Sequence, residues 1–112
     1  MTGFTCIWEF RIRPERRGEF ERHYGADGMW ATLFRQASGY RGTVLLRDRE
    51  GSSRYVTIDR WEDAGSYRAF RQQFSDEYHR LDEQCAALTM EENLIGEFAE
   101  LHGGATEEGA KI

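Results

Sequence analysis

The sequence of 112 residues predicts an α+β fold built from four strands and two helical regions. Apolar and polar residues alternate over residues 4–13, two strand patterns at 39–49 and 54–62 flank a short turn, and an apolar stripe of helical spacing runs over 63–88. A last strand is expected at 92–101. This order is typical of a ferredoxin-like βαββαβ sandwich, which has a four-stranded antiparallel sheet with its helices on one face.

The first third of the chain predicts a strand followed by a broken helix. The residues that share the apolar face of the strand are Phe4, Cys6, Trp8, Phe10 and Ile12. Pro14 suits the first turn of a helix, which we expect to run to about Tyr24 and to stop at Gly25. Asp27 is expected to cap a second short helix. The apolar residues of that second helix are Met29, Trp30, Leu33, Phe34 and Ala37.

The middle of the chain predicts a β-hairpin and then a long helix. The letters EGSS separate the two strand patterns, and this connection is short enough for an antiparallel hairpin. Asp63 is expected to cap the helix that follows. The apolar residues of this helix recur every three or four positions, a spacing that no strand could use. They are Tyr67, Phe70, Phe74, Tyr78, Leu81, Cys85 and Leu88.

The last strand contains a glycine at its centre. Simple alternation would place Leu94 and Phe98 on one face, and Ile95 and Ala99 on the other. Gly96 interrupts this pattern, and a glycine inside a strand indicates a bulge or a close approach of another group.

Size and charge exclude several classes of protein. A chain of this length fits one compact domain, which we expect at residues 1–102, with a flexible tail at 103–112 that lacks any apolar period. The net charge is −5, and the arginines are scattered among acidic residues. A nucleic-acid-binding protein would show a basic cluster, so no nucleic-acid partner is expected.

The sequence also predicts a cytoplasmic protein without a membrane partner. No apolar run approaches the roughly 18 residues of a membrane span, and the first residues do not resemble a secretion signal. Cys6 and Cys85 have no CxxC spacing, so we expect reduced, buried thiols. The residues Asp76, His79 and Glu83 have helical spacing but offer one nitrogen ligand, and we read them as a solvated face rather than a metal site.

Both faces of the predicted sheet carry large apolar side chains. In the strand at 54–62, Val56 and Ile58 have one parity, and Tyr55 and Trp61 have the other. The helices of one chain cover one face only, so the second face requires a partner. The simplest partner is a second copy of the chain packed sheet against sheet, so we expect a homodimer.

Four stretches of the sequence resemble a known family. They are CIWEFRIRP, FERHYGADGMWATLF, GYRGTVLLRD and YVTIDRWEDAGSYRAF, and together they span about residues 4–100. In this order and spacing they resemble the antibiotic biosynthesis monooxygenase family, and the second stretch is most similar to an uncharacterised branch. The resemblance implies a dimeric α/β barrel. The family includes cofactor-independent quinone-forming monooxygenases, haem-degrading enzymes, signal-molecule isomerases and members without a known reaction.

The resemblance also implies a site. In the quinone-forming members a Trp on the third strand and a Tyr at the start of the second helix line the substrate slot, and Trp61 and Tyr67 stand at the matching positions. The family's Asn four residues before the Trp is replaced by Thr57, which is a shorter and weaker anchor. Asp59 has the same parity as Thr57 and Trp61. We expect Asp59, Trp61 and Tyr67 to be the catalytic residues of a site without a cofactor.

Each of these residues has an alternative role. Trp61 and Tyr67 could fill the core, with their polar atoms bonded to the backbone. Asp59 could pair with Arg11 or Arg47, which we favour, or it could hold a raised pKa suited to a base. The expected substrate-binding residues, in a cleft between sheet and helices, are Thr57, Trp8, Trp30, Phe70, Phe74 and His79. A void of about 300 Å³ or more beside Trp61 and Tyr67 would favour a ligand site.

Haem degradation is the less favoured enzymatic alternative. It requires a His on the second helix about ten residues after the Trp, and that position holds Arg71, while His79 lies two turns later. The favoured function is a cofactor-independent monooxygenase of a small aromatic, phenolic or enol-type molecule. The other alternative is a non-catalytic, small-molecule-binding or stress-associated dimer.

Overall fold

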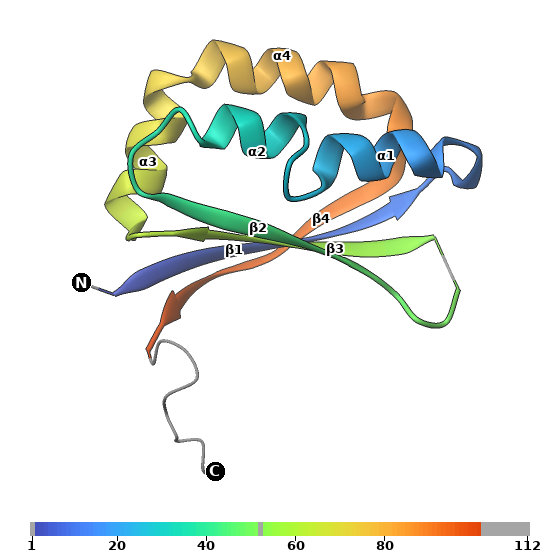
Figure 1. Cartoon of the computed structure of the whole chain (residues 1–112), viewed down its shortest axis with the longest axis horizontal. Helices are drawn as coiled ribbons and strands as arrows, with labels where there is room; N and C mark the ends of the chain where they lie inside the picture. The colour runs from blue at the N-terminus through green and yellow to red at the C-terminus, as the bar shows by residue number, and fades with distance from the viewer. Residues whose placement is uncertain (1, 52, 102–112) are drawn as a thin grey trace, which may run out of the picture.

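A computed structural model describes residues 2–51 and 53–101 as a four-stranded antiparallel sheet with strand order β2-β3-β1-β4. All helices lie on one side of this sheet, and the other side is open (Figure 1). The elements are β1 (Gly3–Ile12), η1 (Pro14–Arg16), α1 (Arg17–Tyr24), α2 (Met29–Phe34), β2 (Tyr40–Arg47), β3 (Arg54–Trp61), α3 (Ala64–Gln73), α4 (Ser75–Cys85), η2 (Ala86–Leu88) and β4 (Thr89–Glu100). The predicted ferredoxin-like order is confirmed.

The core lies between the sheet and the helices. Strand β3 is strictly alternating: the side chains at 55, 57, 59 and 61 are buried, and those at 54, 56, 58 and 60 are half-buried on the open side. On β1 the apolar face predicted from alternation is buried apart from Trp8, which is half-buried. Helices α1 and α2 add Phe20, Tyr24, Trp30 and Phe34 from above.

Most of the predicted helix boundaries are confirmed. Pro14 begins the first helical turn, and Gly25 follows the last residue of α1. The Asp63 carboxylate accepts a hydrogen bond from the backbone N–H of Ser66 at 2.7 Å and caps α3 as expected. The predicted cap of α2 is wrong. Gly28 occupies the cap position, and the exposed Asp27 pairs instead with Arg35 at 2.9 Å.

The long helix expected from residue 63 onward is two helices. Phe74 has φ −110° and ψ 29°, which lies outside the helical region and separates α3 from α4. The backbone N–H of Phe74 still bonds to the carbonyl of Phe70, and that of Tyr78 to the carbonyl of Phe74. The apolar spacing therefore continues through the bend, and no proline or glycine in the sequence signals it.

The bulge expected around Gly96 is confirmed, and it corrects the expected faces of β4. Its pairing with β1 shifts register between Ile7 and Trp8, whose partners are Gly96 and Leu94. Because paired residues share a face, Leu94 lies on the helix side with Trp8, and Phe98 lies on the open side with Thr5. Simple alternation had placed Leu94 and Phe98 together.

The open side of the sheet carries an exposed apolar surface, as the sequence predicts. Val44, Leu46 and Phe98 are each close to half exposed, at 46%, 46% and 45%. The cross-strand partners of Val44 and Leu46 are Ile58 and Val56, which are only partly buried. Ion pairs rim this surface, where Arg54 meets Glu9 and Arg60 meets Glu100. We call Ile7, Val44, Leu46, Val56, Ile58 and Phe98 the open-face cluster.

Cys6 and Cys85 are free and buried, as expected. The helices within residues 2–51 and 53–101 are all too short or too polar to cross a membrane. The predicted tail at 103–112 lies outside the described residues.

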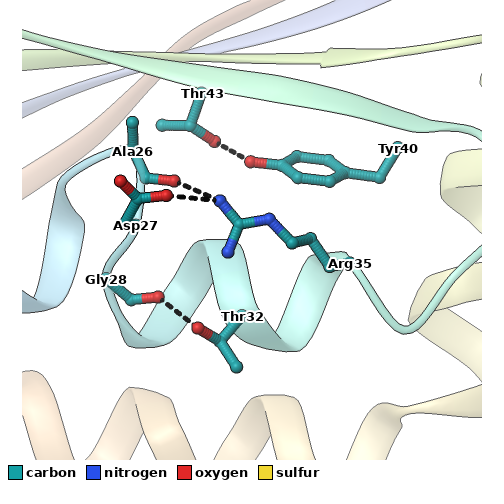
Figure 2. A network of polar contacts seen from close by, with 7 residues as sticks. All are labelled: Ala26, Asp27, Gly28, Thr32, Arg35, Tyr40 and Thr43. Carbon is teal, nitrogen blue, oxygen red and sulfur yellow. Dashed lines mark hydrogen bonds and ion pairs between the residues drawn. The ribbon is translucent and has the colours of Figure 1, made fainter.

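Gly28 joins α1 to α2 at a very close approach of backbone to backbone. A Cβ placed there would lie 2.4 Å from the carbonyl oxygen of Arg22 and 2.5 Å from that of His23. The Gly28 carbonyl also accepts hydrogen bonds from the backbone N–H and the hydroxyl of Thr32, and the hydroxyl bond is drawn in Figure 2. The connection therefore has no room for a side chain.

We expect Gly28→Ala to lower the free energy of unfolding by about 2 kcal/mol or more, because the two carbonyls must move apart. Urea unfolding followed by tryptophan fluorescence measures this change. The control is Gly65→Ala in α3, where the nearest atom lies at an ordinary 3.5 Å. That variant should be neutral or more stable by up to about 1 kcal/mol, and equal losses in both variants would contradict the explanation.

Candidate functional site

A cavity of about 50 Å³, partly open to solvent, lies between the sheet and the helices. Its floor comes from β1, β2, β3 and β4, and its roof comes from α1, α2 and α4. Aromatic rings make up most of the wall, and the remaining lining residues are two threonines and three carboxylates. The lining residues are Trp8, Phe10, Tyr24, Trp30, Phe34, Thr43, Thr57, Asp59, Tyr78, Asp82 and Glu92.

Asp59 is the buried carboxylate of this cavity. Its side chain is 8% exposed, and the alternation of β3 directs it towards the helices. The hydroxyl of Thr43 donates a hydrogen bond of 2.7 Å to Asp59 Oδ1. Thr43 is the cross-strand partner of Asp59 in the hairpin, so the register of β2 and β3 creates this contact.

A second hydroxyl extends the contact. The Tyr40 hydroxyl lies 2.6 Å from Thr43 Oγ1. Figure 2 shows these two hydroxyls pointing toward each other. Since Thr43 gives its proton to Asp59, Tyr40 is the donor to Thr43, and the three groups form a chain of hydrogen bonds that leads away from the cavity. Burial of the phenol raises the pKa of Tyr40, and the hydrogen bond with Thr43 lowers it in part. Arg35, which binds Asp27 and the carbonyl of Ala26, lowers it by a smaller amount.

Burial raises the pKa of Asp59 from its ordinary 3.8 to about 6, and the hydrogen bond from Thr43 opposes part of this rise. The favoured ion pair with Arg11 or Arg47 is wrong. Arg47 instead lies 3.7 Å from Glu21, and Arg11 is exposed. No basic side chain among residues 2–51 and 53–101 forms an ion pair with Asp59. The alternative of a carboxylate suited to act as a base is therefore favoured.

Two further carboxylates lie at the mouth of the cavity. Asp82 projects from α4, and Glu92 projects from β4 beside Phe10 of β1. Both side chains are exposed, in contrast to Asp59. Partial burial raises the pKa of Glu92, and the negative charge of Asp82 raises it further. Asp82 and Glu92 are therefore close enough to influence each other.

Trp61 and Tyr67 do not line the cavity. Trp61 is fully buried, and rings of Phe34, Tyr40, Tyr67 and Phe70 surround it with centroids 5.2–5.6 Å away. Its indole N–H finds no acceptor among the described residues. The Tyr67 hydroxyl accepts a hydrogen bond of 2.8 Å from Arg71. The cavity described above therefore does not supply the expected void beside these two rings.

The predicted substrate-binding residues divide into two groups. Trp8, Trp30 and Thr57 line the cavity together with Asp59, whereas Phe70, Phe74 and His79 do not. His79 is exposed, and its Nδ1 lies 2.8 Å from the carbonyl oxygen of Ser75. Neither His79 nor Arg71 reaches the cavity, so the geometry gives no support to haem binding.

Sequence reasoning missed several of the lining residues. Thr43 could have been found from the hairpin register, since it stands opposite Asp59. Tyr78 was assigned to the apolar stripe of the helix, which is correct, but nothing in the sequence showed that α4 crosses the sheet above Trp8. The other lining residues that sequence reasoning missed are Phe10, Tyr24, Phe34, Asp82 and Glu92.

Two other hollows on the described surface lack this combination of rings and a buried acid. One of about 260 Å³ lies beside Gly28 and Met29, and one of about 490 Å³ lies beside Arg17, Arg47 and Gly51. Among residues 2–51 and 53–101, no group of three or more His, Cys, Asp or Glu side chains has the arrangement of a metal site. The cavity beneath Trp30 is therefore the candidate site.

Fold and site define a small ferredoxin-like α+β protein with an aromatic cavity between sheet and helices. The sequence profile of the antibiotic biosynthesis monooxygenase family matches residues 3–84. The chain belongs to this family, as the resemblance in the sequence indicated.

Solved structures share the fold at low sequence identity. Rv0793 from Mycobacterium tuberculosis has a TM-score of 0.70 and 20% identity, covering 92% of this chain and 99% of that one. PA3566 from Pseudomonas aeruginosa has a TM-score of 0.65 and 19% identity, covering 91% and 97%. SnoaB from Streptomyces nogalater, a cofactor-independent oxygenase, has a TM-score of 0.62 and 23% identity, covering 96% and 100%. A search of curated proteins found no match.

Proposed function

We propose that the protein is a cofactor-independent monooxygenase that oxidises a small aromatic, phenolic or enol-type molecule in the cavity. One observation carries the proposal: Asp59 is a buried carboxylate with a pKa raised to about 6 in the wall of an aromatic cavity. A base with this pKa is largely ionised at neutral pH and still accepts a proton readily. Family membership and the fold shared with the oxygenase SnoaB support the same function.

In the proposed reaction Asp59 removes a proton from an acidic C–H or O–H of the substrate. The resulting anion transfers an electron to O₂, and the two radicals combine to a peroxide anion at carbon. The proton held by Asp59 then returns to this anion and gives the hydroperoxide. Loss of water then leaves a carbonyl, so that a CH₂ group and O₂ give C=O and H₂O. The substrate itself supplies the electrons.

While Asp59 holds the proton, the hydroxyls of Thr43 and Tyr40 can share it through their hydrogen bonds. When Asp59 is protonated, it can donate to Thr43, and the two hydroxyl groups can reverse their direction. The indole N–H of Trp30 is buried and has no acceptor at hydrogen-bonding geometry among the described residues. Burial raises the pKa values of Tyr24 and Cys85, and the nearby indole of Trp30 lowers both in part.

The size of the cavity favours the second candidate, a non-catalytic protein. A volume of about 50 Å³ holds a few water molecules, whereas ligand pockets usually begin near 300 Å³. Turnover therefore requires the roof formed by α1, α2 and α4 to move outward. Oxygen uptake measured against a panel of anthrones, polyphenols and enols tests the proposal, and a panel without enzyme-dependent uptake would favour the non-catalytic protein.

The catalytic roles of Trp61 and Tyr67 remain predictions from the resemblance, and the tight packing of Trp61 favours core filling. We expect Trp61→Phe to lower the free energy of unfolding by about 1–3 kcal/mol, because it leaves a void. Turnover by Trp61→Phe and Tyr67→Phe, measured by oxygen uptake, should stay within about threefold of the parent rate. A loss of tenfold or more in a folded Tyr67→Phe variant would restore the catalytic role.

We also propose that the active form is a homodimer joined through the open-face cluster. The exposed apolar side chains on the uncovered side of the sheet support this assembly, because a monomer would leave them in water. A two-fold axis through the face would bring Leu46 and Phe98 of one copy against the same surface of the other.

A further inference from the structure

The cavity carries an unbalanced negative charge. Asp59, Asp82 and Glu92 line it, and no Lys, Arg or His of residues 2–51 and 53–101 does. A phenolate or carboxylate ligand would meet three acidic groups without a cationic partner. A positively charged group would be attracted by all three.

The acids lie at two separate ends. Asp59 of β3 pairs with Cys6 of β1, and Glu92 of β4 pairs with Phe10 of β1. Cys6 and Phe10 are four residues apart on β1, which is roughly 13 Å along a strand, and Trp8 lies midway between them. Asp59 is buried and Glu92 is exposed, so the cavity runs from a deep end with one acid to a mouth with the second acid and Asp82.

The rings near the mouth suit a cation. Trp30 and Tyr78 pack edge to face with centroids 5.0 Å apart, and Tyr24 lies beside Trp30 at 6.1 Å. Tyr78 already binds one cation, since the guanidinium of Arg71 lies 3.9 Å from its ring centroid. Arg71 does not line the cavity, and its guanidinium is bonded to the Tyr67 hydroxyl. The faces of such rings attract ammonium groups in the same way.

We propose that the cavity, once its roof has moved outward, selects an aromatic amine whose phenol or enol end lies at Asp59 and whose protonated nitrogen lies at the mouth, between Asp82 and Glu92. The position of the phenol end at Asp59 rests on the proposed function, in which Asp59 is the base. The selection for positive charge depends on the acids and rings at the mouth, whether or not oxygen is used.

Isothermal titration calorimetry at neutral pH with three probes of similar shape tests this selection. Tyramine carries a positive charge, 4-ethylphenol carries none, and 3-(4-hydroxyphenyl)propionate carries a negative charge. We expect tyramine to bind about tenfold more tightly than 4-ethylphenol, and the propionate to bind more weakly than either. Glu92→Gln should lower the affinity for tyramine several-fold and leave that for 4-ethylphenol within about twofold.

Glu91→Gln is the matched control, since it removes the same charge from the neighbouring residue on the other face of β4, opposite Arg11. It should bind tyramine like the parent protein. The inference is overturned if 4-ethylphenol binds as tightly as tyramine, if Glu91→Gln weakens tyramine as much as Glu92→Gln, or if no probe binds. Oxygen uptake with uncharged phenols and without charge selection would overturn the inference alone. Charge selection without oxygen uptake on any substrate would overturn the proposed function alone.

Discussion

Replacing Asp59 with asparagine is expected to lower oxygen uptake by about 10²–10⁴-fold while making the protein more stable at neutral pH. The loss of rate follows because asparagine cannot accept the proton. The gain in stability follows because a buried carboxylate with a raised pKa costs free energy when it ionises. Because Asp59→Asn should lower the rate of oxygen uptake and raise the free energy of unfolding, a loss of activity in this variant cannot be attributed to unfolding.

The stability of the folded protein should change with pH in a defined direction. The pKa of Asp59 is about 6 in the folded protein and near 3.8 in the unfolded chain, so the folded state binds more protons between these values. The stability of the parent protein should therefore fall as pH rises from about 4 to 6, by up to about 3 kcal/mol from this group, and then level off. The Asp59→Asn variant should not show this fall in stability. Urea unfolding at several pH values measures it.

The rate should rise with pH through about 6, because Asp59 must be ionised to act as a base. Thr43→Val removes the hydrogen bond that lowers the pKa of Asp59, so its profile should shift to higher pH. Asp76→Asn, an exposed carboxylate on α4, is the control and should retain the parent profile. Full activity in a folded Asp59→Asn protein would exclude Asp59 as the base.

The second large effect is expected from Leu46→Asp. Light scattering should find the parent protein as a dimer at micromolar concentration and this variant as a monomer. Leu46 is 46% exposed on the apolar face, where it lies on the edge strand β2, and the proposed dimer would bury two new carboxylates. We expect the dissociation constant to rise on the order of a hundredfold.

Met29→Asp is the matched control for this variant. Met29 is 41% exposed, but it begins α2 on the helix side of the sheet, away from the open-face cluster. An acidic residue is also favourable in the first turn of a helix. This variant should stay dimeric. A parent protein that is monomeric in light scattering, or a dimer unaffected by Leu46→Asp, would contradict the assembly.

Local patterns were sufficient for most of the fold. The alternation of β1 and β3, Pro14 at the first helical turn, Gly25 at the end of α1 and Asp63 as a helix cap act over a few residues and are visible in the chain itself. The two errors at helices, the cap of α2 and the bend at Phe74, arise where packing overrides local preference. The faces of β4 were misassigned because the bulge reverses the alternation after Gly96.

The candidate site was only partly visible in the sequence. Parity showed that Thr57 and Asp59 face the helices, but the choice between an ion pair and a base depended on which charges the fold brings near Asp59. The resemblance implied catalytic roles for Trp61 and Tyr67, yet neither side chain lines the cavity. Trp30, Tyr78 and Glu92 line one cavity with Trp8 only because the fold brings α2, α4 and β4 together beside β1.

The amino-acid sequence by itself determined the order of strands and helices, the inward face of β3 and the presence of a second apolar face. These properties follow from periodicity, which each segment carries within itself. Only the tertiary structure decided where the cavity lies, that Asp59 is held by Thr43 without a cation, and that the acids occupy two ends. Burial and charge separation depend on segments far apart in the chain, so no local pattern encodes them.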